Sequence, residues 1–79
     1  MHILVKLFAT LTRHVPDAHS GTPLEIDIAA GATIADLIKK LRLPAQEIKV
    51  VFVNGRARPL DWQLNPGDEV GIFPPIGGG

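Results

Sequence analysis

Residues 33–42, TIADLIKKLR, decide the fold, because they carry the clearest helical pattern in the chain. Apolar residues recur at the i, i+3, i+4, i+7 spacing of one helix face, at Ile34, Leu37, Ile38 and Leu41. Thr33 is a good N-cap, and Asp36 three residues later resembles a capping box, with Asp in place of the usual Glu. Lysines and an arginine fall in the last turn, and Pro44 ends the helix. We therefore predict one amphipathic helix that must bury its apolar stripe against another element.

Two strands are predicted before this helix, at residues 2–9 and 22–28, because polar and apolar residues alternate there. In the first strand the alternation puts Ile3, Val5 and Leu7 on one face and Leu4, Lys6 and Phe8 on the other. Residues 10–21 are polar and contain Pro16 and Gly21, which predicts a loop. The two strands are expected to pair as a hairpin.

Three strands are predicted after the helix. Residues 48–53 are β-branched and aromatic, and the following Asn54-Gly55 is a strong hairpin signal. Residues 56–58 would return as a short edge strand, ended by Pro59. A short irregular segment at 60–64 and a turn at 65–68 lead to the last strand, residues 69–73.

This order predicts an α+β fold: a mixed sheet of four to five strands with one main helix packed on one face. It is the order of the β-grasp (ubiquitin-like) roll, in which the first and last strands pair in parallel at the centre of the sheet. We take that pairing partly by analogy. The predicted domain covers residues 1–73, and residues 74–79, Pro-Pro-Ile-Gly-Gly-Gly, form a flexible C-terminal tail.

Composition excludes several classes of protein. Lys+Arg and Asp+Glu are 8 each, so the formal net charge of zero argues against nucleic acid or an anionic membrane as partner. The absence of cysteine removes disulfides, iron–sulfur clusters and thiol nucleophiles. The apolar runs are far shorter than a membrane span, and the N-terminus lacks a signal-peptide pattern. We expect a cytoplasmic protein.

The last residues, Phe73 to Gly79, have no role in stabilising a fold. Glycine loses the most conformational freedom on ordering, so three terminal glycines cannot be there for stability. Pro74 and Pro75 stiffen the segment that precedes these glycines. The reactive group of the three terminal glycines is the carboxylate of Gly79. It is ionised at neutral pH and is inert as an acyl donor until it is activated.

The whole chain resembles the MoaD/ThiS family of ubiquitin-like sulfur carriers. Three segments carry the resemblance: Val53-Asn54-Gly55, then Leu64-Asn65-Pro66-Gly67-Asp68-Glu69-Val70, then Phe73-Pro74-Pro75-Ile76 before a terminal Gly-Gly. Phe-Pro-Pro before the glycines is closer to the small subunit of molybdopterin synthase than to the thiamin carrier.

The resemblance implies a specific chemistry. A ubiquitin-activating-type adenylyltransferase would adenylate Gly79 with ATP, and a sulfur donor such as a cysteine desulfurase or rhodanese would convert it to a thiocarboxylate. The carrier would then join the large subunit of molybdopterin synthase, in an expected heterotetramer, and deliver sulfur to a pterin precursor. The tail residues Pro74, Pro75, Ile76, Gly77 and Gly78 would thread channels in these partners. The chain would be a non-catalytic carrier with no bound cofactor, the ATP being used by the activating partner.

Three other functions stay open at this stage. The carrier could serve another pathway, such as thiamin or tungsten cofactor. The chain could be a ubiquitin-like modifier, joined through Gly79 to lysines of other proteins. It could also be a β-grasp binding module with an inert tail. The acceptor of the activated Gly79 separates a carrier from a modifier.

A docking patch is predicted at the root of the tail. If the first and last strands are parallel neighbours, Phe8 and Phe73 lie close together on the solvent face, where aromatic residues favour an interface. Trp62 either covers the small core or contacts a partner. Arg56 and Arg58 either pair with an acidic partner or protect a solvated edge strand, and we favour the second. The three histidines lack the spacing of a metal or catalytic site, so none is predicted.

Overall fold

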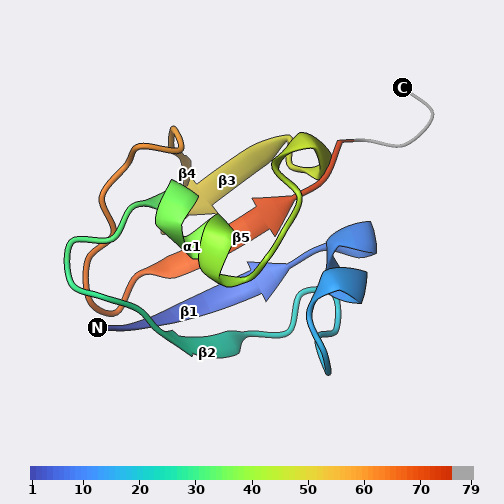
Figure 1. The fold of residues 1–79 in the computed structure, drawn as a ribbon, viewed down its shortest axis with the longest axis horizontal. Coiled ribbons are helices and arrows are strands. Elements are labelled where there is room, and N and C mark those ends of the chain that lie inside the picture. Colours follow the sequence, from blue (N-terminus) through green and yellow to red (C-terminus); the bar gives the residue numbers. More distant parts are fainter. Residues whose placement is uncertain (76–79) are drawn as a thin grey trace.

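The first and last strands of the chain lie side by side at the centre of the sheet (Figure 1). The computed structural model describes residues 1–75. β1 (His2–Leu7) pairs in parallel with β5 (Glu69–Phe73), with Val5 opposite Val70. This confirms the central pairing that the sequence analysis took by analogy.

Three more strands extend the sheet on both sides, in the order β2-β1-β5-β3-β4. β2 (Leu24–Asp27) runs antiparallel to β1, and β3 (Val50–Val53) runs antiparallel to the other side of β5. β4 (Arg56–Ala57) forms one edge. It follows β3 through Asn54-Gly55, both with positive φ, as the tight hairpin requires. The fold is therefore the predicted α+β roll of β-grasp type, and every strand lies within its predicted range.

The helix α1 (Ile34–Lys40) begins at the predicted capping box. Thr33 Oγ1 accepts from the Asp36 backbone N–H at 3.2 Å, and an Asp36 carboxylate oxygen accepts from the Thr33 N–H at 2.9 Å. The hydrogen bond that the Asp36 carboxylate accepts from the Thr33 backbone N–H is the main reason that the pKa of Asp36 lies below its usual value. The helix ends at Lys40 with Leu41 as its C-cap, and Arg42 follows with φ of +57°, a left-handed residue that stops the helix.

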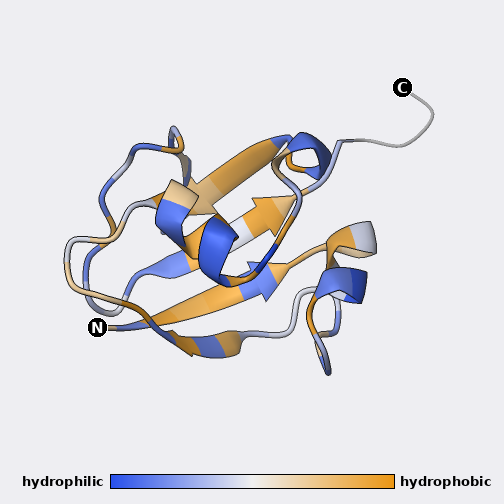
Figure 2. Cartoon of the chain, in the orientation of Figure 1, coloured by the Kyte–Doolittle hydropathy of each residue, from blue (hydrophilic) through white to orange (hydrophobic). Residues whose placement is uncertain are grey.

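One face of the sheet and the apolar stripe of α1 enclose the core. Figure 2 shows apolar residues along β1, β3 and β5, and hydrophilic residues on the outward side of α1. The buried apolar residues of the core are Ile3, Val5, Leu7, Leu11, Ile34, Leu37, Ile38, Leu43, Val51, Val53, Leu64, Val70 and Ile72. Within residues 1–75, no helix is long and apolar enough to cross a membrane.

Two 3₁₀ helices were not predicted. Residues 10–21 were expected to be a loop, but η1 (Ala9–His14) begins this segment, and its Leu11 is fully buried. A second, η2 (Ala45–Glu47), precedes β3. Each is too short to produce a helical period in the sequence, and η1 is fixed by one apolar side chain that reaches the core.

Candidate functional site

The tail leaves the sheet from its centre. β5 ends at Phe73, and the backbone oxygen of this residue accepts a hydrogen bond from the Lys49 N–H at 2.8 Å. Pro74 and Pro75 follow without regular structure. The end of β5 coincides with the boundary predicted between domain and tail. The predicted tail residues Ile76, Gly77, Gly78 and Gly79 lie outside the described residues.

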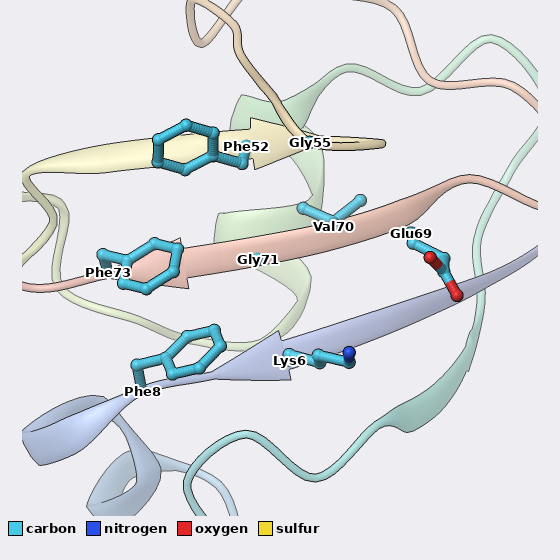
Figure 3. A pocket seen from close by; sticks show the side chains of 8 residues that line it. All are labelled: Lys6, Phe8, Phe52, Gly55, Glu69, Val70, Gly71 and Phe73. Atoms are coloured by element: carbon cyan, nitrogen blue, oxygen red, sulfur yellow. The ribbon is translucent and has the colours of Figure 1, made fainter.

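Three phenylalanines from three strands or strand ends gather at this point (Figure 3). The rings of Phe8 and Phe73 are stacked, with centroids 4.2 Å apart and planes 6° apart. Phe52 of β3 meets Phe73 edge to face, with centroids 5.5 Å apart. All three are half-buried, so the predicted proximity of Phe8 and Phe73 is confirmed, although neither ring is fully exposed.

Sequence reasoning missed Phe52. The signal was present, because Val51 and Val53 are buried in the core and the residue between them must point to the other face of the sheet. We name the three rings Phe8, Phe52 and Phe73 the aromatic cluster.

Gly71 forms the floor of a hollow beside the aromatic cluster. The hollow has a volume of about 310 Å³, and Lys6 and Glu69 lie at its other end (Figure 3). A Cβ on Gly71 would lie 3.3 Å from Phe73 Cε2 and 3.5 Å from Phe8 Cε2. Glycine at this position therefore lets the two rings lie over the strand and leaves the backbone open at the base of the hollow.

Trp62 lies apart from the aromatic cluster, since it lines two other hollows and not this one. Its ring packs against the hydrophobic core, and the guanidinium carbon of Arg58 lies 4.0 Å from the ring centroid. Its indole Nε1–H is buried and has no acceptor within residues 1–75. The geometry favours the first of the two predicted roles, a cover over the core.

Asp68 shapes the turn before β5. It is the one buried charged residue among those described, with 7% of its surface exposed. Its two carboxylate oxygens accept from Asn54 Nδ2 at 2.9 Å and from the Asn65 backbone N–H at 2.7 Å. Glu69 is exposed on the other side of the strand, so the two neighbouring carboxylates diverge.

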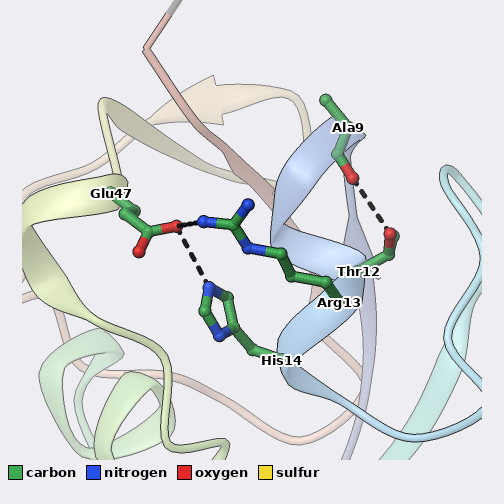
Figure 4. A network of polar contacts seen from close by, with 5 residues as sticks. All are labelled: Ala9, Thr12, Arg13, His14 and Glu47. Carbon is green, nitrogen blue, oxygen red and sulfur yellow. Dashed lines mark hydrogen bonds and ion pairs between the residues drawn. The ribbon is translucent and has the colours of Figure 1, made fainter.

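A polar cluster ties the two 3₁₀ helices together near the root of the tail (Figure 4). One carboxylate oxygen of Glu47 lies 3.0 Å from Arg13 Nη2 and 3.0 Å from His14 Nε2. The hydrogen bond with His14 is the main cause that lowers the pKa of Glu47, and the nearby charge of Arg13 acts in the same direction. His14 and Glu47 are far apart in the chain, so sequence spacing alone does not predict this contact.

Within residues 1–75, no group of three or more His, Cys, Asp or Glu side chains is placed to hold a metal ion. The site combines an apolar face with the root of a tail that ends in three glycines.

A sequence profile of the ThiS family matches residues 5–79, almost the whole chain. The chain belongs to the ThiS family. It is a ubiquitin-like protein of the sulfur-carrier type. A search of curated proteins found no significant match.

Solved structures agree with this membership. The chain is 27% identical to SAMP1 from Haloferax volcanii, over 100% of both chains, with a TM-score of 0.73. It is 26% identical to a putative molybdopterin converting factor subunit 1 from Pyrococcus furiosus, over 96% of this chain and 99% of that one, with a TM-score of 0.72.

A third structure, the complex of subunits 1 and 2 of molybdopterin-converting factor from Helicobacter pylori, shares the fold. It is 17% identical and covers 100% of both chains, with a TM-score of 0.64. All three structures share the ubiquitin-like β-grasp fold with this ThiS-family protein.

Proposed function

We propose that this ThiS-family protein carries sulfur as a thiocarboxylate on Gly79 and supplies it to molybdopterin synthesis as the small subunit of molybdopterin synthase. The observation that carries the proposal is the position of the tail. Phe73, the last residue of the central strand, is held in the aromatic cluster, and a glycine-ended tail follows directly. When a partner binds the aromatic cluster, the position from which the tail begins is therefore fixed relative to that partner.

The chemistry takes two steps, both on partner enzymes. The Gly79 carboxylate attacks the α-phosphorus of ATP, pyrophosphate leaves, and an acyl-adenylate forms. A hydrosulfide then attacks the acyl carbon, and AMP leaves with the bridging oxygen. Where the donor is a protein persulfide, its outer sulfur attacks instead and an acyl disulfide forms; a second thiol then attacks the donor's own sulfur, the S–S bond breaks, the thiocarboxylate leaves and the donor keeps a disulfide. The net change is one carboxylate oxygen replaced by sulfur. The chain itself contributes the acyl group and no catalytic residue, and it binds no cofactor.

The aromatic cluster and the hollow over Gly71 are the proposed docking face. Half-buried aromatic rings beside an open backbone offer apolar area and a recess for a partner side chain. The partners are a ubiquitin-activating-type adenylyltransferase, a sulfur donor, and the large subunit of molybdopterin synthase. The likeness to subunit 1 of the P. furiosus converting factor supports this pathway. We expect the carrier to act in the cytoplasm.

A second function, protein modification, has one observation in its favour. The H. volcanii relative is a small archaeal modifier protein, and it is 27% identical to this chain. A modifier would use the same acyl-adenylate and transfer Gly79 to lysine amines of other proteins. The two functions differ only in the acceptor.

The test uses a variant that lacks Gly79, together with the activating enzyme and ATP. Deletion is expected to abolish adenylation and sulfur loading while the melting temperature stays that of the full chain, because the tail follows the last strand of the sheet. Loss of folding in the truncated chain, or normal loading without Gly79, would contradict the proposal. Transfer of the tail to lysines in place of sulfur loading would favour the modifier.

A further inference from the structure

A second hollow lies at the end of the sheet away from the tail. Its volume is about 180 Å³, and its lining includes Asn54, Arg56, Arg58, Trp62 and Asp68. It sits around the β3–β4 turn and the loop that precedes β5. Nothing in the proposed tail chemistry uses these residues.

The strand register places this hollow on the helix side of the sheet. Arg56 pairs with Val53, whose side chain is buried in the core, whereas Ala57 pairs with Phe52, which belongs to the aromatic cluster. Because side chains alternate along a strand, Arg56 points to the side opposite the aromatic cluster. A ligand in this hollow would leave the proposed docking face free.

The hollow is also separated from the tail along the sheet. Asp68 comes immediately before β5, and the tail begins after Phe73 at the other end of this strand. Five residues of extended strand span roughly 13–17 Å. Occupation of the hollow is therefore compatible with a tail that is threaded into another protein.

Its two arginines have no acidic partner in the described chain. The ion pairs within 4 Å among residues 1–75 involve neither Arg56 nor Arg58. The guanidinium of Arg58 is held over the indole of Trp62, at 4.0 Å from the ring centroid. The electron-rich face of the indole attracts the cation and holds it there, and the N–H groups of the guanidinium stay available to an oxyanion beside the ring.

The acidic residue in the lining does not neutralise both arginines. Asp68 directs its two oxygens to Asn54 Nδ2 and to the Asn65 N–H, at 2.9 and 2.7 Å. Two arginines against one aspartate leave this lining with positive formal charge. The exposed Asp61 lines a neighbouring hollow, which shares Trp62 and Asn65 with this one.

Size and stacking indicate the class of ligand. Pockets for cofactors and drug-sized molecules measure about 300–1,000 Å³, which is more than this hollow offers. Arg58 occupies a face of the indole, so Trp62 is not free on that face to stack a nucleotide base. A carboxylate side chain fits both the volume and the planar donor groups of the arginines.

We propose that this hollow, the arginine hollow, binds an acidic segment of a partner protein through Arg56 and Arg58. Charges on an edge strand also discourage strand pairing, and that accounts for the exposure of Arg56 on β4. Edge protection does not require two arginines to converge on one side of a hollow, with one of them stacked on the protein's only tryptophan. The proposal is independent of the chemistry of Gly79.

Trp62 makes the hollow directly observable, since it is the only source of tryptophan fluorescence. The full-length protein is titrated with a capped oligoglutamate peptide and, in parallel, with a capped oligoglutamine peptide. We expect a saturable change in Trp62 fluorescence with oligoglutamate alone, and an affinity that falls as salt is raised. Equal binding of the two peptides would overturn the proposal.

Charge-matched variants decide whether the arginines are responsible. Arg56→Gln together with Arg58→Gln is expected to weaken oligoglutamate binding about tenfold or more. The control, Lys39→Gln with Lys40→Gln, removes the same charge from the exposed end of α1 and should leave the affinity within about twofold. Arg56→Gln alone, at an exposed position, keeps the test valid if loss of the Arg58 stack impairs folding.

Two results would overturn this assignment. An equal loss of affinity in the lysine control would show general electrostatic attraction and no site. Inorganic phosphate that saturates the same fluorescence change more tightly than the peptide, with the same dependence on the arginines, would make this a phosphate site instead.

Discussion

Phe8 and Phe73 stack ring on ring, with centroids 4.2 Å apart, although they come from opposite ends of the chain. The contact follows from the parallel pairing of β1 and β5, in which Leu7 lies opposite Ile72 and the next residue of each strand carries a phenylalanine. The first strand thereby fixes the side chain from which the tail departs. We infer that this stack presents the tail to partner enzymes in a defined position.

Replacing the ring at the root of the tail should separate binding from folding. Phe73→Ala is expected to weaken binding to the activating adenylyltransferase about tenfold or more, since aromatic residues dominate such interfaces. The half-buried ring should cost about 1–2 kcal/mol of unfolding free energy, less than a core phenylalanine. Calorimetric titration with the partner and urea unfolding measure the two effects.

The matched control for this variant is Leu60→Ala. Leu60 is a large apolar residue with 47% of its surface exposed, and it does not line the hollow over Gly71. Its replacement should leave the affinity for the activating enzyme unchanged. An equal loss in both variants, or no loss with Phe73→Ala, would argue against the aromatic cluster as the docking face.

Filling the floor of the hollow tests the same face without removing a ring. A side chain at Gly71 meets Phe73 and Phe8 at once, because even a Cβ would lie 3.3 and 3.5 Å from their ring carbons. Gly71→Val should move the stacked rings, seen as changed ring-current shifts in NMR spectra, and weaken partner binding about tenfold. Unfolding free energy should change little, since valine suits a strand better than glycine. Undiminished affinity in a variant with displaced rings would contradict the docking role.

Asp68 is predicted to be a main source of local stability. Asp68→Ala removes the acceptor for Asn54 Nδ2 and for the Asn65 N–H in a largely buried place. We expect a loss of about 2–4 kcal/mol in unfolding free energy, measured with urea. Asp61→Ala, at an exposed carboxylate, should stay within about 0.5 kcal/mol. Similar values for both variants would mean that the turn does not depend on these hydrogen bonds.

Glu47 should make the fold sensitive to acid. Its pKa lies below the ordinary value of 4.5, chiefly because of the hydrogen bond with His14. A lowered folded-state pKa means that the stabilisation is present above the unfolded pKa and is lost as the pH falls through the folded one. Glu47→Gln is therefore expected to lower the melting temperature at pH 7 and to flatten its decline below about pH 4.5. If the melting temperature of the variant falls below about pH 4.5 as steeply as that of the unchanged protein, another carboxylate causes the acid sensitivity.

The sequence predicted the elements with local signals. The capping box at Thr33, the apolar stripe of α1 and the Asn54-Gly55 turn each act over a few residues, and all three are present in the fold. The pairing of β1 with β5 depends on residues far apart in the chain, and it was reached by resemblance to a known fold. Alternation within the strands then sufficed to bring Phe8 to Phe73.

What the sequence did not predict depends on contacts across the chain. η1 is fixed by burial of the single residue Leu11 and carries no periodic pattern. The hydrogen bond between His14 and Glu47 joins two segments that only the folded sheet brings together. The same holds for Arg58 over Trp62, so the arginine hollow could not be assembled from sequence spacing alone.

The central claim is that Gly79 becomes a thiocarboxylate, and mass spectrometry tests it most directly. The protein is purified from its own cells with an alkylating reagent added at lysis, so that a thiocarboxylate is trapped before it hydrolyses. The chain has no cysteine, so alkylated sulfur can lie only at the tail or at Met1, and fragment masses separate the two. We predict that one oxygen of Gly79 is replaced by alkylated sulfur. A tail that carries only its ordinary carboxylate, or one joined to lysines of other proteins, would contradict the account.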